Sequence, residues 1–302
     1  MASAIAAATA PPTGAQHSVL LLRRANDYLA AALRARYRVL SFYDSGGAPL
    51  PAFLAASAAA EPEAPRAALV VGVDAAFLVA GAGEVFSTDV ADHAIGLLID
   101  VLRNVSAADR YVCRGLWPVQ GDYPLGSKLG GKRVGIIGLG SIGSSIAKRL
   151  KAFGFVIQYH SRRPKDGVSF RYFHDVISLA TESDALIVAC ALNDQTRHIV
   201  NKEVLRALGK DGVVVNIARG GNIDEAELIS MLREGKIAGA GLDVFEKEPV
   251  VPPEFFSMDN VVLTAHEAVF TTESGSDLCD LMIGNLEAFF DGRPLLTPVP
   301  PK

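Results

Sequence analysis

Residues 133–153 read RVGIIGLGSIGSSIAKRLKAF, in which a short apolar run is followed by closely spaced glycines and an amphipathic stretch. This order predicts a strand, a tight turn and a helix. The alternation of apolar runs with amphipathic stretches continues along the chain, as it does where crossover helices join parallel strands. The sequence therefore predicts an α/β fold with a doubly wound (Rossmann) parallel sheet, with strands at 134–137, 156–160, 185–189, 213–217, 239–244 and 261–264.

The glycine-rich turn has the residues that a dinucleotide-binding site needs. Gly138 permits the tight turn, Gly140 lets the backbone approach a pyrophosphate, and Gly143 lets the helix pack closely on the strand. Ser141 and Ile142 complete the turn, and the helix N-terminus would face the phosphates. The alternative is a strand-to-helix turn that binds no ligand.

The end of the second strand indicates which dinucleotide is bound. A site that prefers NAD places an Asp or Glu about 20 residues after the turn, where it bonds the ribose 2′-hydroxyl. The chain instead reads His160, Ser161, Arg162 and Arg163. A guanidinium can pair with a 2′-phosphate, and no carboxylate is present to repel it. We therefore expect NADP(H) to be preferred over NAD(H), with a solvated basic loop as the alternative.

Three polar residues lie at expected strand ends, where ligands bind in an open α/β sheet: Arg219 in NIARGG, Glu248 in VFEKEP and His266 in LTAH. Reduction of a 2-keto acid needs a cation for the carboxylate and carbonyl, and an acid that protonates the oxygen. Arg219 and His266 suit these roles, and Glu248 would bond the other ring nitrogen of His266. Taken singly, they could be a loop charge, a surface acid and a core histidine.

Composition narrows the function to small-molecule chemistry. The 302 residues are 50% hydrophobic and carry a net charge of −4, so no overall positive field exists for nucleic acid. The apolar runs are too short to span a membrane. The three cysteines are widely spaced and odd in number, so they fit neither a disulfide framework nor a metal site. This pattern favours a reducing compartment, and we expect a cytoplasmic location. Each is expected to be a small core residue.

A smaller α/β region precedes the sheet, with strands expected at 18–22, 38–41 and 68–71. The sequence predicts a smaller, truncated flavodoxin-like substrate domain of residues 17–88 and 270–302, into which a dinucleotide-binding domain of residues 89–269 is inserted. Residues 1–16 are uncharged and rich in alanine, which predicts a disordered tail. A plastid transit peptide is the alternative.

Two long helices are expected at the domain boundaries. Ser87 or Thr88 would cap the first, which would serve as a hinge. The second would end before Gly292 and pack through apolar residues at helical spacing: Leu278, Leu281, Met282, Leu286, Phe289 and Phe290.

The motifs GLGSIG, NIARGGNIDEAEL, GAGLDVFEKEP and LTAH occur in this order. From about Ser87 onward the chain resembles the D-isomer-specific 2-hydroxyacid dehydrogenase family, and within it the plant hydroxypyruvate/glyoxylate and hydroxyphenylpyruvate reductases. The resemblance implies three catalytic residues: Arg219, Glu248 and His266. It also implies that Asp243 bonds the nicotinamide carboxamide and that Ser161 and Arg162 favour NADPH. A homodimer is implied too, in which Trp117 either approaches the partner's substrate site or is a core or interface residue.

The sequence departs from the family before the hinge helix. The family carries there a glycine-bearing loop whose N–H groups hold the substrate carboxylate, but residues 74–87 are too few for a crossover, that loop and a further strand. The substrate loop is therefore expected to be missing, leaving Gly81 and Gly83 as possible donors. Ala265 stands where the family has proline, and Glu267 places an acid directly after the histidine.

Two functions are consistent with these patterns. The first is an NADPH-dependent reductase of a 2-keto acid such as hydroxypyruvate, glyoxylate or hydroxyphenylpyruvate. The second is a catalytically impaired isoform that binds dinucleotide and acts as a regulatory or interaction protein. The short first domain is the feature that favours the second.

Overall fold

The computed structural model describes residues 17–22, 25, 27–46, 49, 52–53, 55–56, 67–69 and 80–299. The chain forms two compact units, one of residues 86–271 and one that contains the described residues before 86 and after 271. The expected tail 1–16 and residues 70–79 of the short connection lie outside the described residues.

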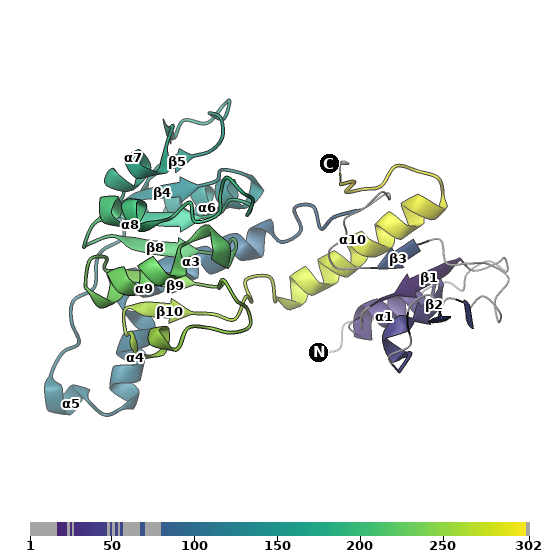
Figure 1. Cartoon of the computed structure of the whole chain (residues 1–302), viewed down its shortest axis with the longest axis horizontal. Coiled ribbons are helices and arrows are strands. Elements are labelled where there is room, and N and C mark those ends of the chain that lie inside the picture. The colour runs from purple at the N-terminus through teal and green to yellow at the C-terminus, as the bar shows by residue number, and fades with distance from the viewer. Residues whose placement is uncertain are drawn as a thin grey trace. The chain divides into compact units, whose positions relative to one another are not determined.

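The larger unit contains a seven-stranded parallel sheet in the order β10–β9–β8–β7–β4–β5–β6 (Figure 1). The six expected strands are confirmed to within two residues, as is the doubly wound fold. The expectation missed β6, an edge strand too short to show an apolar run. The strands are β4 (Arg133–Ile137), β5 (Val156–His160), β6 (Arg171–Phe173), β7 (Ala185–Val188), β8 (Val213–Asn216), β9 (Gly239–Leu242) and β10 (Val261–Leu263).

Helices cover both faces of this sheet, because its strands are apolar on both sides. One face packs against α3 (Ser87–Arg103) and α6 (Ser141–Ala152). The other packs against α7 (Val176–Thr181), α8 (Lys202–Leu208) and α9 (Glu225–Arg233). Helix α3 begins at Ser87 with Phe86 at its cap position, so neither Ser87 nor Thr88 caps it as expected.

Two further helices, α4 (Val105–Cys113) and α5 (Trp117–Gln120), follow α3 and extend away from the sheet (Figure 1). Cys113 is exposed on α4, so the expectation that every cysteine lies in the core is wrong for this residue. The side chain of Trp117 is also exposed, which excludes a core position within this chain.

The smaller unit has a parallel sheet in the order β2–β1–β3. Its strands are β1 (Ser18–Leu21), β2 (Arg38–Ser41) and β3 (Ala67–Leu69). Helices α1 (Asp27–Arg34) and α10 (Thr272–Phe290) share a core with β1, in which Leu33 and Ile283 are buried. The expected terminal helix is thus confirmed, and Gly292 follows it with φ 68°. None of the helices in the described part of the chain has the length and apolar character that crossing a bilayer requires.

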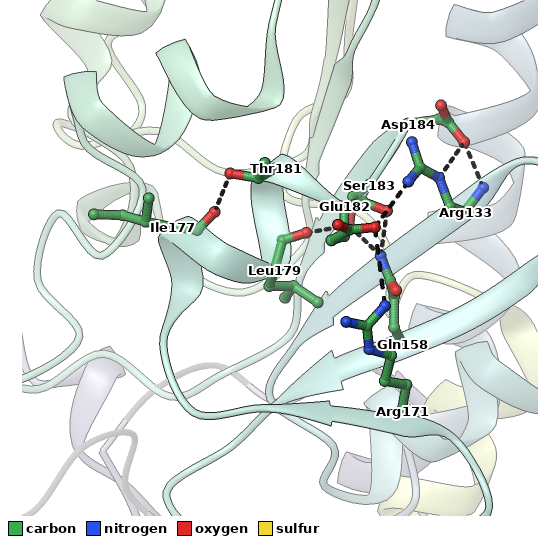
Figure 2. A network of polar contacts seen from close by, with 9 residues as sticks. All are labelled: Arg133, Gln158, Arg171, Ile177, Leu179, Thr181, Glu182, Ser183 and Asp184. Carbon is green, nitrogen blue, oxygen red and sulfur yellow. Dashed lines mark hydrogen bonds and ion pairs between the residues drawn. The ribbon is translucent and has the colours of Figure 1, made fainter.

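A polar network links the amino ends of β4, β6 and β7 to the middle of β5 (Figure 2). The Arg133 guanidinium donates to Glu182 (3.1 Å) and, through Nε, to Asp184 (3.4 Å). The side chain of Gln158 is only 3% exposed and donates to the Glu182 carbonyl (2.6 Å) and the Ser183 hydroxyl (3.0 Å). Burial alone would raise the pKa of Asp184, but hydrogen bonds from Arg133 hold it below its usual value.

Replacing Gln158 by leucine is expected to lower the free energy of unfolding by about 1–3 kcal/mol, because buried polar groups of Glu182 and Ser183 would lose a donor. The midpoint of urea unfolding measures this. Thr181→Ala is the matched control, because among the described residues its exposed hydroxyl donates only to the Ile177 carbonyl in the same helix (Figure 2). The expected change is within about 0.5 kcal/mol. Equal effects of the two substitutions would contradict the role given to the network.

Candidate active site

The carboxyl ends of all seven strands lie at one edge of the larger sheet. Chain connections run in opposite directions from β4, first to β5 and later to β7, so the strand order reverses between these two neighbours. In doubly wound sheets the ligand crevice lies at such a reversal. The topology therefore brings the glycine-rich turn and the loops after β7, β8, β9 and β10 to the same edge.

The glycine-rich turn has the shape of a phosphate cradle. Gly138 has φ 100°, and a Cβ there would lie 2.8 Å from the Cys190 backbone. A Cβ on Gly143 would lie 2.1 Å from the Gly138 carbonyl oxygen, so only glycine permits this packing. Gly140 precedes α6 and has open space at its Cβ position. Ser141 and Ile142 begin the helix, whose positive end faces this space.

The loop after β5 presents two arginines to solvent. Arg162 and Arg163 are exposed, and neither forms an ion pair within the described residues. The Ser161 hydroxyl donates to the Arg163 carbonyl (2.5 Å) and the Tyr172 hydroxyl donates to the Ser161 carbonyl (3.3 Å), which shapes the loop. Two guanidinium groups are thereby available for an anion.

His266 and Glu248 come together as expected. The ring Nδ1 of His266 lies 2.7 Å from Glu248 Oε2, while Glu248 Oε1 accepts from the Phe245 N–H (2.9 Å). Nδ1 is engaged, so Nε2 is the nitrogen that remains for a substrate. His266 has φ 51°, a left-handed conformation that costs a non-glycine residue about 1–2 kcal/mol. The surrounding loop has to hold it there.

Arg219 lies on the neighbouring loop, but its side chain is not bonded to the histidine or the glutamate. Its guanidinium donates to the Ala218 carbonyl (2.6 Å) and is otherwise exposed. Its backbone is fixed by Asn222, whose side-chain oxygen accepts from the Arg219 N–H (3.1 Å). The next residue, Gly220, fits against the backbone of Phe245, so the loops that carry Arg219 and Glu248 are in contact.

Asp243 is 1% exposed and organises the loop that carries His266. Its carboxylate accepts from the Thr264 hydroxyl (2.7 Å) and from the N–H groups of Glu267 (2.9 Å) and Ala268 (3.2 Å). Its carbonyl accepts from the His266 N–H (2.8 Å). Burial alone would raise the pKa of Asp243, but hydrogen bonds from His93, Thr264 and the loop hold it below its usual value. Most of this carboxylate is thus engaged by the protein.

His93, on α3, was not among the residues that the sequence predicted for the site. Its Nε2 is 2.9 Å from the Thr264 hydroxyl and 3.4 Å from Asp243 Oδ1. The hydrogen bond to Asp243 raises the pKa of His93, against the opposing effect of burial. No spacing in the sequence links a helix residue to a loop 171 positions away.

Cys190, in the larger unit, and Gly81, in the smaller unit, are not free to act on a ligand. Burial raises the pKa of the Cys190 thiol to about 11, which keeps it protonated and unreactive. The Gly81 N–H, which was expected to be a possible donor to the substrate, donates to the Thr297 carbonyl (2.9 Å). A Cβ on Gly83 would lie 2.8 Å from the Thr297 side chain, so the turn packs closely on this residue.

Comparison with known proteins confirms the resemblance seen in the motifs. Residues 95–268 match the family described as D-isomer specific 2-hydroxyacid dehydrogenase, NAD binding domain. A glyoxylate/hydroxypyruvate reductase of Arabidopsis thaliana is 56% identical over 222 residues, which are 74% of this chain and 69% of the relative. A hydroxyphenylpyruvate reductase of Plectranthus scutellarioides is 52% identical over 72% of this chain and 69% of its own length.

A solved structure is similar in fold to most of the chain. It is the NADPH-dependent glyoxylate/hydroxypyruvate reductase from Sinorhizobium meliloti, in complex with NADP and malonate. The TM-score is 0.82 at 34% identity, and the match covers 94% of this chain and 97% of that one.

Proposed function

Because the chain belongs to the D-isomer-specific 2-hydroxyacid dehydrogenase family, we propose that it uses NADPH to reduce a 2-keto acid to the D-2-hydroxy acid. Hydroxypyruvate, glyoxylate and hydroxyphenylpyruvate are the proposed substrates, since the relatives are named for them. The observation that carries the proposal is the His266–Glu248 pair, at 2.7 Å, at the same sheet edge as the glycine-rich turn.

In this proposal two side chains act directly on the substrate, and a third acts on the histidine that donates the proton. Arg219 binds the carboxylate and polarises the carbonyl, once its guanidinium turns from the Ala218 oxygen. His266 donates the proton on Nε2 to the carbonyl oxygen while the carbon receives a hydride. Glu248 holds Nδ1 and compensates the charge of the ring.

The residues of the cofactor cradle fit a dinucleotide. Gly138, Gly140 and Gly143 leave room for a pyrophosphate beside the N-terminus of α6. When bound, NADPH supplies the hydride. Ser161, Arg162 and Arg163 would hold its 2′-phosphate. Asp243 is proposed to bond the nicotinamide carboxamide through the lone pairs of its carboxylate oxygens that the hydrogen bonds from the loop do not use. NAD(H) would bind more weakly because it lacks the 2′-phosphate.

We also propose that the protein is a cytoplasmic homodimer that binds no nucleic acid or membrane. Support for a dimer comes from α4, α5 and the loop after them, where several apolar side chains are exposed: Val105, Val112, Trp117, Val119 and Leu125. Support for a reducing location comes from the cysteines, all three of which are free. The comparisons do not favour the alternative that the chain only binds dinucleotide in a regulatory role.

The decisive experiment measures NADPH oxidation by the purified full-length protein with hydroxypyruvate, glyoxylate and hydroxyphenylpyruvate, after fluorescence has established NADPH binding. Turnover of at least one keto acid, with the D-product identified by a chiral assay, is the expected result. Binding of NADPH without turnover of any of the three would overturn the proposed activity.

Replacing Arg162 by alanine is expected to weaken NADPH binding by about 10- to 100-fold, because one charge-assisted pair with the 2′-phosphate is lost. NADH binding should change by less than about threefold. Fluorescence titration with both dinucleotides checks this, and Lys165→Ala, at another exposed position of the same loop, is the control. A parallel loss of affinity for NADPH and NADH would remove the phosphate role from Arg162.

A further inference from the structure

The loop that carries His266 depends on one carboxylate. Asp243 receives hydrogen bonds from the Thr264 hydroxyl and from the N–H groups of Glu267 and Ala268. These donors flank His266 on both sides, and His266 itself is bonded to the Asp243 carbonyl. Any shift of the Asp243 carboxylate would therefore move the whole of loop 264–268.

His93 holds this arrangement from a different element. The single hydroxyl proton of Thr264 is donated to Asp243, so the Thr264 oxygen must accept from His93 Nε2 at 2.9 Å. The same Nε2 lies 3.4 Å from Asp243 Oδ1. His93 is therefore a donor at Nε2, and it bridges α3 to the loops after β9 and β10.

We propose that His93 is a positioning residue for the reduction: through Thr264 and Asp243 it keeps loop 264–268 in the geometry that presents His266 to the substrate. This inference rests on the proposed function, since it assigns a role in the same site. His93 itself contacts neither the His266 ring nor Glu248 among its described hydrogen bonds. Small displacements of a catalytic group are costly, on the order of 10²-fold for about 1 Å.

The charge of His93 depends on the carboxylates around it. Asp243 and then Glu267, both at the ends of neighbouring strands, raise the pKa of His93 against burial. Arg149, on helix α6 packed against α3, forms its ion pair with Asp92 and not with Asp243 or Glu267 among the described residues. The stabilisation from a charged His93 is complete below its unfolded pKa of about 6.5 and is lost as pH rises through the higher folded value. The attraction between charged His93 and Asp243 is also lost in acid, when Asp243 becomes protonated below its lowered pKa.

The stability difference between the wild-type protein and His93→Gln should follow this charge. Glutamine keeps an N–H donor for Thr264 but has no charge for Asp243. The difference in urea midpoint is expected to be largest near about pH 6 and to shrink toward about pH 9. A difference that is constant across this range would show that the charge of His93 does not act on the loop.

The kinetic test compares His93→Leu, His93→Gln, Thr264→Val and the double variant His93→Leu/Thr264→Val in the full-length protein. His93→Leu is expected to lower kcat for hydroxypyruvate by about 10- to 100-fold, with a smaller rise in the Kd for NADPH of less than about tenfold, because Asp243 is proposed to bond only the carboxamide of the cofactor. His93→Gln should restore most of kcat. The kcat of the double variant should lie within about twofold of that of His93→Leu, because both substitutions break the same chain of hydrogen bonds from His93 through Thr264 to Asp243. His174→Leu is the control, because this exposed histidine directly follows β6, at the opposite edge of the sheet from β10.

Hydrogen exchange of the backbone amides separates this inference from the proposed function. In His93→Leu the amides of residues 264–268 should exchange at least about tenfold faster, whereas those of α9 should not change. If the wild-type protein turns over no keto acid, the proposed activity fails and the exchange result alone decides the positioning role. If the wild-type protein is active but His93→Leu leaves kcat and the exchange unchanged, the positioning role is wrong.

Discussion

Replacing His266 by alanine is expected to lower kcat for hydroxypyruvate by about 10²- to 10⁴-fold. The reason is the loss of the group that protonates the carbonyl oxygen, since Nδ1 is bonded to Glu248 at 2.7 Å and Nε2 is the proton donor. NADPH affinity should stay within about twofold, because the cradle for the cofactor lies on other loops. Steady-state kinetics and a fluorescence titration measure the two quantities separately.

Two variants make this prediction specific. Glu267→Ala keeps the backbone N–H that bonds Asp243 and removes only an exposed side chain, so its kcat should be close to that of the wild-type protein. Glu248→Gln keeps the size of the side chain but removes its charge, and should fall between the wild-type protein and His266→Ala. Wild-type activity in His266→Ala would eliminate it as the acid.

Gly220→Ala is expected to have the second large effect. A Cβ at Gly220 would lie 1.9 Å from the Phe245 carbonyl carbon and 2.3 Å from the Glu246 nitrogen. These are backbone atoms, so the loops that carry Arg219 and Glu248 would have to separate. We expect kcat/KM to fall by about 10²-fold or more and the free energy of unfolding to fall by about 1–3 kcal/mol.

Gly221→Ala is the matched control for this steric effect. A Cβ at Gly221 would meet only the ends of flexible side chains, with Leu192 at 3.1 Å and Arg197 at 3.5 Å. Its kcat/KM should remain within about threefold of the wild-type value. Circular dichroism and a urea midpoint establish whether each variant is folded. Similar losses in the two variants would show that contact with the Phe245 backbone is not what matters at Gly220.

The fold could be predicted from the sequence because its signals are local. Each long strand is an apolar run, and the glycine spacing after β4 requires a particular turn. The edge strand β6 begins with the exposed Arg171 and has no such run, so it was missed. The start of α3 was misplaced because Ser87 and Thr88 are good cap residues in general, whereas the helix already begins at Ser87 and Phe86 has the cap position.

The site could be predicted only as far as topology determines it. Parallel strands bring Glu248 and His266 to one edge, and their pairing followed from chemistry. The bond between Gly81 and Thr297 joins residues far apart in the chain, and no pattern indicates it. The same holds for His93 on α3, whose partners lie in the loops after β9 and β10. The orientation of the Arg219 side chain is a local choice of rotamer that sequence does not specify.

The polar network of Arg133, Glu182 and Asp184 lies at the amino ends of β4 and β7, where Gln158 joins it from the middle of β5, whereas His266 and Glu248 follow the carboxyl ends of other strands. A strand of five residues, such as β4, spans about 16 Å, which is beyond the range over which substitutions usually interact. Changes at the two edges should therefore combine additively. During evolution, mutations that alter substrate preference at one edge could be tolerated because stabilising substitutions at the other edge compensate for them without altering the reaction.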